Sequence, residues 1–139
     1  TKGAIYGNFP DKAALADAAF DYAARTVKDL IRDRLRPFSS ARGKLSALLD
    51  FFAQYALTPP IPGGCPLLNT AVEADDNRVS MRPVVSAEIM QVVNAIATIL
   101  RQGIRSGEFK KDTNVRELAY TFFCAIEGAI MFSRVERSR

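Results

Sequence analysis

The 139-residue sequence contains no histidine, no tryptophan and only two cysteines. Without histidine the chain lacks the commonest general base and the commonest metal-ligating side chain, which argues against a zinc enzyme or a histidine-based catalytic triad. Cys65 and Cys124 lie too far apart in the sequence to form a CxxC metal or redox pair. No glycine-rich phosphate loop or serine-nucleophile motif is present. We therefore expect no metal, no cofactor and no enzymatic activity.

Long hydrophobic runs and a secretory leader are also missing. The longest apolar run, 119–132, has 14 residues and includes Thr121 and Glu127, whereas a transmembrane helix needs about 20 apolar residues. The polar start of the chain does not resemble a signal peptide, and so few cysteines fit a reducing compartment. These absences predict a cytoplasmic protein with no membrane contact. The net charge of +4 mildly favours an anionic partner.

Strand signals are absent, and helical periodicity takes their place. No stretch alternates apolar and polar residues, and no Asn-Gly or Asp-Gly hairpin turn occurs. Apolar residues instead recur every three or four positions, which is the pattern of helices with one buried face. Prolines, glycines and capping residues divide this pattern into helices expected at 12–36, about 41–56, 66–74, from near 83 to 106, and 114–134. The predicted fold class is an all-α helical bundle.

The last predicted helix is apolar around nearly its whole circumference. Such a helix is buried on more than one side, either by its own chain or by the chain and a second copy. We favour a homodimer, because Gly128 would allow a partner backbone to approach closely. The expected interface residues are Leu118, Phe122, Ala125, Gly128, Ala129 and Phe132.

Residues 1–15 resemble the segment in which the recognition helix of TetR-type (tetracycline-repressor-like) bacterial transcriptional regulators runs into the next helix. The matching positions are Gly3, Tyr6, Phe9, Lys12 and Leu15. Two further segments, 64–76 and 107–119, are similar to the family's central segment and to the connection before its dimerisation helix. The resemblance implies a helical bundle of the TetR ligand-binding and dimerisation type.

By this resemblance, residues 1–9 are a remnant of the DNA-binding helix-turn-helix, and residues 10–139 form the effector-binding and dimerisation domain. The chain would then lack the first two helices of the helix-turn-helix domain and the last helix of the dimerisation bundle. The residues implied to contact DNA are Thr1, Lys2, Gly3, Tyr6, Asn8 and Lys12. Tyr6 could instead be a core residue, and Lys2 and Lys12 could be solvated surface.

The function implied is that of a ligand-responsive, DNA-binding regulator, a repressor that a small apolar effector releases from a palindromic double-stranded DNA operator. A helical small-molecule carrier or adaptor without DNA binding is the alternative. Apolar helix faces with isolated polar groups suggest the pocket residues, although each could be plain core: Phe52, Tyr55, Asn69, Met90, Asn94, Phe123 and Glu127.

Two polar residues in apolar surroundings leave alternatives open. Cys65 lies at the expected start of a helix, where a thiol's pKa can be lowered, so it is either a sensor thiol or a small buried residue. Glu127 is the only charged residue in the 14-residue apolar run and needs a partner, a ligand or a proton. It could contact a cationic effector or accept a structural hydrogen bond from a neighbouring helix.

Overall fold

The computed structural model describes residues 7–136, and all the regular structure in this range is helical. The elements in chain order are α2 (Lys12–Leu35), α3 (Ala41–Leu57), α4 (Pro66–Asp76), the short 3₁₀ helix η1 (Val79–Met81), α5 (Arg82–Arg105) and α6 (Val115–Glu136). The all-α fold class is thereby confirmed. Of the residues expected to contact DNA, Thr1, Lys2, Gly3 and Tyr6 lie outside the described residues.

Local side-chain chemistry accounts for most helix ends. The Asp11 side chain caps α2 by accepting a hydrogen bond from the Ala14 backbone N–H at 2.7 Å, and Ser40 caps α3 through the N–H of Gly43 at 3.0 Å. Pro83 stands in the first turn of α5, where its missing N–H is tolerated. Gly107 follows α5 with φ +77, a conformation that glycine adopts without strain.

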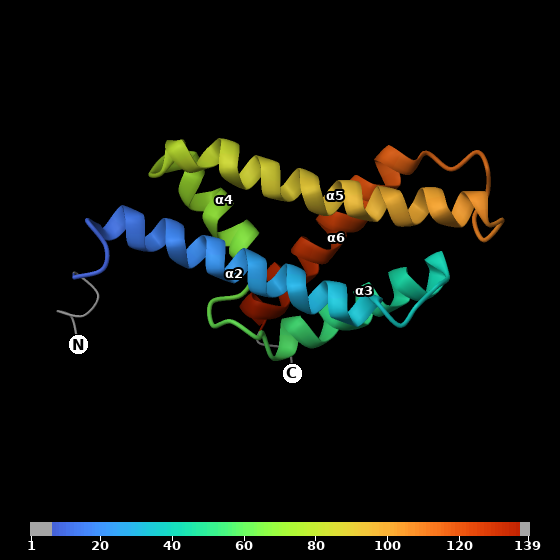
Figure 1. Ribbon diagram of the computed structural model, residues 1–139, viewed down its shortest axis with the longest axis horizontal. Coiled ribbons are helices and arrows are strands. Elements are labelled where there is room, and N and C mark those ends of the chain that lie inside the picture. The colour runs from blue at the N-terminus through green and yellow to red at the C-terminus, as the bar shows by residue number, and fades with distance from the viewer. Residues whose placement is uncertain (1–6, 137–139) are drawn as a thin grey trace.

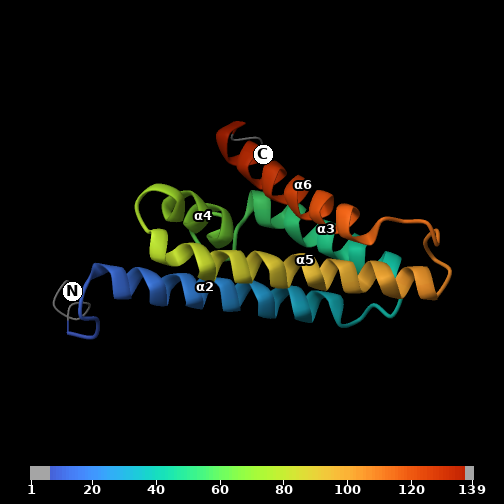
Figure 2. The same cartoon turned by 90° about the horizontal axis from the view of Figure 1, so that it is seen from above.

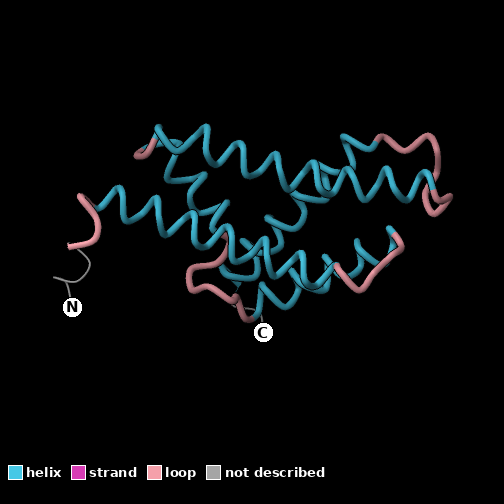
Figure 3. Tube along the Cα trace, viewed as in Figure 1, coloured by secondary structure: helices cyan, strands magenta, loops and turns pink. Residues whose placement is uncertain are grey.

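The helices form an elongated bundle in which α2 and α5 run side by side along the long axis (Figures 1 and 2). Each of these two helices packs against α3 and α4, and the two have few direct contacts with each other. Helix α6 packs against α3 and α5. Figure 3 shows that the loops joining α2 to α3 and α5 to α6 lie at one end of the bundle, whereas the proline-rich loop between α3 and α4 lies along its lower side.

Three apolar clusters make up the core. The central cluster joins α3, α5 and α6 and consists of Leu48, Val93, Ile96, Ala97, Leu100 and Ala119. The α2–α4–α5 cluster consists of Phe20, Ala24, Ala74, Met81 and Val85, and the α3–α6 cluster consists of Tyr55, Cys65, Ile126 and Ile130. Half-buried Ile89, Phe52 and Leu67 each pack against two of these clusters, so the core is continuous.

Two helical stretches are long and apolar enough to cross a membrane by length and composition alone. They are Val79–Arg105 and Val115–Glu136. The prediction from the sequence considered only uninterrupted apolar runs and therefore did not identify them. Core helices of water-soluble proteins also meet this criterion. Of the most apolar window in each stretch, 33% is buried in Val79–Arg105 but only 17% in Val115–Glu136. Helix α6 therefore leaves much apolar surface uncovered by its own chain.

Candidate ligand cavity and dimerisation face

A small cavity of about 40 Å³ lies inside the bundle and is lined by residues from all five α-helices. Its walls are mostly apolar, with Val27 from α2, Phe52 from α3, Leu67 from α4, and Phe123 and Ile126 from α6. Pockets for small ligands typically span roughly 300–1,000 Å³. The cavity is therefore smaller than a typical ligand site, and a ligand could enter only if the surrounding helices moved apart.

Four of the seven predicted pocket residues meet in this cavity, namely Phe52, Tyr55, Phe123 and Glu127. The other three lie elsewhere. Asn69 donates a hydrogen bond to the Gly63 carbonyl at 2.7 Å, Met90 Sδ accepts one from Tyr120 at 3.3 Å, and Asn94 is exposed on α5. Their helices were assigned correctly, but periodicity alone does not show which side of a buried stripe faces a cavity.

Three polar side chains gather at the α6 side of the cavity. The Cys65 thiol donates to Glu127 Oε1 at 3.1 Å, and the Tyr55 hydroxyl donates to the Gly64 carbonyl at 3.0 Å. Glu127 Oε2 is buried and has no hydrogen-bond partner among the described residues. One oxygen of this carboxyl group therefore has a structural partner of the kind expected for Glu127, while the other has none among the described residues.

Burial sets the protonation of this cluster. It raises the pKa of Glu127 above its ordinary value, against a smaller lowering effect of the hydrogen bond from Cys65. Burial, reinforced by the nearby Glu127 carboxylate, also raises the pKa of Cys65 to about 12. Burial and the negative charges of Cys65 and Glu127 raise the pKa of Tyr55 to about 12. Burial therefore disfavours the charged form of all three groups.

The α4 N-terminus does not give Cys65 a low thiol pKa. The backbone N–H groups of Leu67 and Leu68 in its first turn lower this pKa, but larger effects raise it. Although Cys65 is the N-cap residue of α4, its side chain is only 6% exposed and packs in the α3–α6 cluster. Desolvation and the neighbouring carboxylate outweigh the helix terminus, which acts over a short range. The buried-residue alternative for Cys65 fits the structure.

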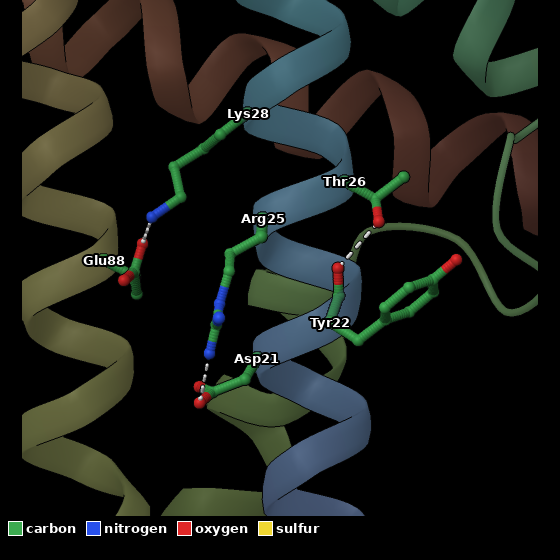
Figure 4. A network of polar contacts seen from close by, with 6 residues as sticks. All are labelled: Asp21, Tyr22, Arg25, Thr26, Lys28 and Glu88. Carbon is green, nitrogen blue, oxygen red and sulfur yellow. Dashed lines mark hydrogen bonds and ion pairs between the residues drawn. The ribbon is translucent and has the colours of Figure 1, made fainter.

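One ion pair connects α2 and α5 beside the cavity. Lys28 Nζ donates to Glu88 Oε2 at 2.8 Å, as Figure 4 shows from close by, and both residues line the cavity. The neighbouring contacts in Figure 4, Arg25 with Asp21 and Thr26 with the Tyr22 carbonyl, stay within α2. The helical pattern of the sequence did not predict that Lys28 and Glu88 form a pair. Their separation of 60 residues leaves no local pattern to detect.

The outer face of α6 carries most of the residues predicted for a dimer interface. Leu118, Ala125, Gly128, Ala129 and Phe132 are all exposed, with Phe132 at 63%. An added Cβ at Gly128 would meet nothing within 4 Å. The exposed apolar face also includes two residues not predicted, Met131 and Val135.

Phe122 differs from the other predicted interface residues. It is half-buried and packs against both the central cluster and the α3–α6 cluster. At the opposite end of the chain, Asn8 and Lys12 are exposed before and at the start of α2. The structure therefore separates the predicted DNA-contacting residues that it describes from the cavity and from the α6 face.

Comparison with known proteins gives a consistent set of matches. The family model for the tetracyclin repressor-like C-terminal domain matches residues 41–139. An uncharacterized HTH-type transcriptional regulator of Mycobacterium tuberculosis, Rv0196, is 30% identical over 98% of this chain and 69% of its own length.

Two solved structures of TetR-family transcriptional regulators are also similar. The regulator from Chloroflexus aurantiacus has a TM-score of 0.90 and 38% identity, covering 96% of this chain and 68% of its own. The regulator from Cytophaga hutchinsonii has a TM-score of 0.86 and 37% identity, covering 100% of this chain and 70% of its own. All three matched proteins are transcriptional regulators.

Proposed function

Because this chain belongs to the TetR family of transcriptional regulators, which are not enzymes, we propose that it forms part of a ligand-responsive, DNA-binding repressor. In this proposal, residues 1–9 belong to the recognition helix and residues 10–139 form the effector-binding and dimerisation domain. The repressor acts in the cytoplasm, where a small apolar effector releases it from a palindromic operator. The observation that carries the proposal is the apolar cavity enclosed by all five α-helices.

The composition of the cavity supports an effector that is mainly apolar. Phe52, Phe123 and Ile126 supply apolar walls, and apolar contact is the main source of affinity for small ligands. The unpartnered Oε2 of Glu127 supplies one directional contact. The effector is therefore an apolar molecule that presents one polar group toward α6.

The course of α2 and α4 supports communication between the cavity and the N-terminal end. Helix α2 has 24 residues and spans about 36 Å at 1.5 Å per residue, with Lys12 at one end and cavity residue Val27 beyond its middle. Helix α4 begins at the cavity with Pro66. Past its end, Arg78 pairs with Asp17 of α2.

An effector that expands the cavity would displace α4 and α2 together, because the α2–α4–α5 cluster joins them. Displacement of Lys12 and the residues before it alters the spacing of the two recognition helices in a dimer. Such dimers bind half-sites about one helical turn apart. A coupling of about 1–3 kcal/mol between effector and operator would weaken DNA binding roughly 5- to 150-fold.

The test is fluorescence anisotropy of labelled DNA from upstream of the protein's own gene, with a scrambled duplex as the control. The protein from the complete gene should bind the natural sequence much more tightly than the scrambled one, with affinity falling steeply as salt concentration rises. Apolar compounds that raise the melting temperature of the protein should then release the DNA. Equal and weak binding to both duplexes would contradict the repressor and support a small-molecule carrier.

A further inference from the structure

An open groove of about 690 Å³ lies between α2 and α5, the two helices that run side by side in Figure 1. Its volume falls within the roughly 300–1,000 Å³ of small-molecule sites. Phe38 lines the groove where α2 turns into α3. The groove is thus a second candidate site, larger and more open than the buried cavity.

The floor of the groove is apolar. Ile31 and Leu35 come from α2, Leu48 from α3, and Ile96 and Ile99 from α5. Three of these residues, Ile31, Leu48 and Ile96, also line the buried cavity. A floor of this kind favours a linear apolar chain over a compact polar ligand, because each buried CH₂ group contributes about 0.8 kcal/mol.

The rim of the groove is cationic. The charged residues among those that line it are Lys28, Arg32, Arg36 and Lys44, and no described residue of the lining carries a carboxylate. Three of the four have acidic partners outside the lining: Lys28 pairs with Glu88, Arg32 with Asp29 and Arg36 with Asp33, each at 2.8 Å. The fourth, Lys44, differs.

The ammonium group of Lys44 is held by a neutral partner. Lys44 Nζ donates to Gln102 Oε1 at 3.0 Å, and Gln102 in turn donates to the Ser39 carbonyl at 2.9 Å. Lys44 is half-buried, and none of the ion pairs among the described residues includes it. A partly desolvated positive charge with only an amide beside it is a site for an anion.

We propose that the α2–α5 groove binds an amphiphilic carboxylate, whose linear apolar chain lies on the floor while its carboxylate pairs with Lys44. A neutral chain would leave the charge of Lys44 uncompensated, and a cationic amphiphile would be repelled by the rim. The site differs in charge preference from the buried cavity, which presents the carboxyl group of Glu127. This inference concerns binding alone and does not depend on the proposed repressor activity.

The test is isothermal titration calorimetry of the protein with dodecanoate, dodecan-1-ol and dodecyltrimethylammonium, each below its micelle concentration. Dodecanoate should bind about tenfold or more tightly than the alcohol, as expected for a charge-assisted contact, and the ammonium compound should not bind. Lys44→Gln should remove this preference without changing the affinity for the alcohol. Lys111→Gln, a change at an exposed lysine outside the groove, should have no effect.

A second pair of variants locates the apolar chain. Ala95 is exposed and lines the groove, whereas its neighbour Asn94 is exposed but does not. Ala95→Trp should fill the groove and abolish binding with an unchanged melting temperature, and Asn94→Trp should bind dodecanoate like the wild type. Equal affinities for dodecanoate and dodecan-1-ol, or an unaltered affinity in Lys44→Gln or Ala95→Trp, would overturn the proposal. So would a changed oligomeric state in Ala95→Trp, which would identify the groove as a protein interface.

Discussion

At the residue scale, Glu127 has two carboxylate oxygens in different surroundings. One accepts a hydrogen bond from the Cys65 thiol, and the other is buried and has no partner among residues 7–136. An isolated buried charge is strongly destabilising, which is why burial raises the pKa of this group. Burial thus disfavours the charged form, which needs a compensating contact.

The pH dependence of stability should carry the signature of Glu127. Since its pKa is raised in the folded chain, its contribution to stability is fully present below the unfolded-state pKa and is lost as pH rises through the folded-state pKa. Glu127→Gln cannot titrate, so its melting temperature relative to the wild type should increase between about pH 4 and pH 8. Thermal unfolding followed by circular dichroism measures this difference. The exposed Glu136 provides the control, because Glu136→Gln should show a difference that does not vary with pH.

Cys65 should be an unreactive thiol. With its pKa raised to about 12 and its side chain buried, very little thiolate is present near neutral pH. In a Cys124→Ser background, iodoacetamide should modify Cys65 about tenfold or more slowly in the native protein than in guanidinium at pH 8, as measured by mass spectrometry. Equal rates in the two states would restore the sensor-thiol hypothesis.

At the element scale, the helices were largely predictable because their boundaries have local causes. Asp11, Ser40 and Gly107 each act through the backbone of their own turn, so the sequence alone locates the helix ends to within a few residues. Helix α4 extends to Asp76, past its expected end, and the 3₁₀ helix before α5 was not predicted. Both differences lie next to Arg78, which pairs with Asp17 of α2 and with Glu73 of α4.

The packing partners of the side chains were harder to predict. The Lys28–Glu88 and Cys65–Glu127 pairs join residues 60 and 62 positions apart, and periodicity contains no information on such pairs. Because α6 is apolar around nearly its whole circumference, its sequence pattern did not distinguish inward-facing Phe122 from the exposed residues around it.

Two helix glycines should respond in opposite ways to alanine. At Gly103 of α5, a Cβ would overlap the Phe109 ring and lie 2.8 Å from the Ala41 Cβ, so Gly103→Ala should destabilise the fold by about 1–3 kcal/mol. At Gly128 of α6 the space within the single chain is open, and Gly128→Ala should raise the stability of the monomer, at concentrations where the proposed dimer is dissociated, by up to about 1 kcal/mol through helix propensity. Urea denaturation at one fixed protein concentration compares them. Similar effects of the two substitutions would contradict the packing described for α5.

At the scale of the whole molecule, the outer face of α6 exposes apolar side chains that the single chain does not cover. The exposed apolar residues of α6 include Leu118, Met131, Phe132 and Val135, and contiguous apolar surface of this kind marks an interaction site. A symmetric dimer would cover this face in both copies at once. The prediction that α6 mediates dimerisation therefore concerns assembly rather than folding of the single chain.

A charge on this face should dissociate the dimer. Phe132→Glu would bury a carboxylate in each half of the interface, and we expect it to weaken self-association by about 2 kcal/mol or more. Leu57→Glu is a matched control, since Leu57 is similarly exposed, at 62%, but belongs to the end of α3 rather than to α6. Sedimentation equilibrium should show a dimer for the wild type and Leu57→Glu and a monomer for Phe132→Glu. A wild-type monomer would refute the interface.

Several residues of the cavity wall are less buried than the residues of the core clusters, and this difference affects which positions can change in evolution. Cavity residues Val27, Phe52 and Phe123 are only half-buried, whereas Leu100 and Ile130 in the neighbouring clusters are 2% exposed. Mutations at these half-buried wall residues therefore remove less packing than mutations at fully buried cluster residues. If the cavity is the effector site proposed above, exchanges at these wall positions would change the ligand preference while the buried clusters keep the scaffold.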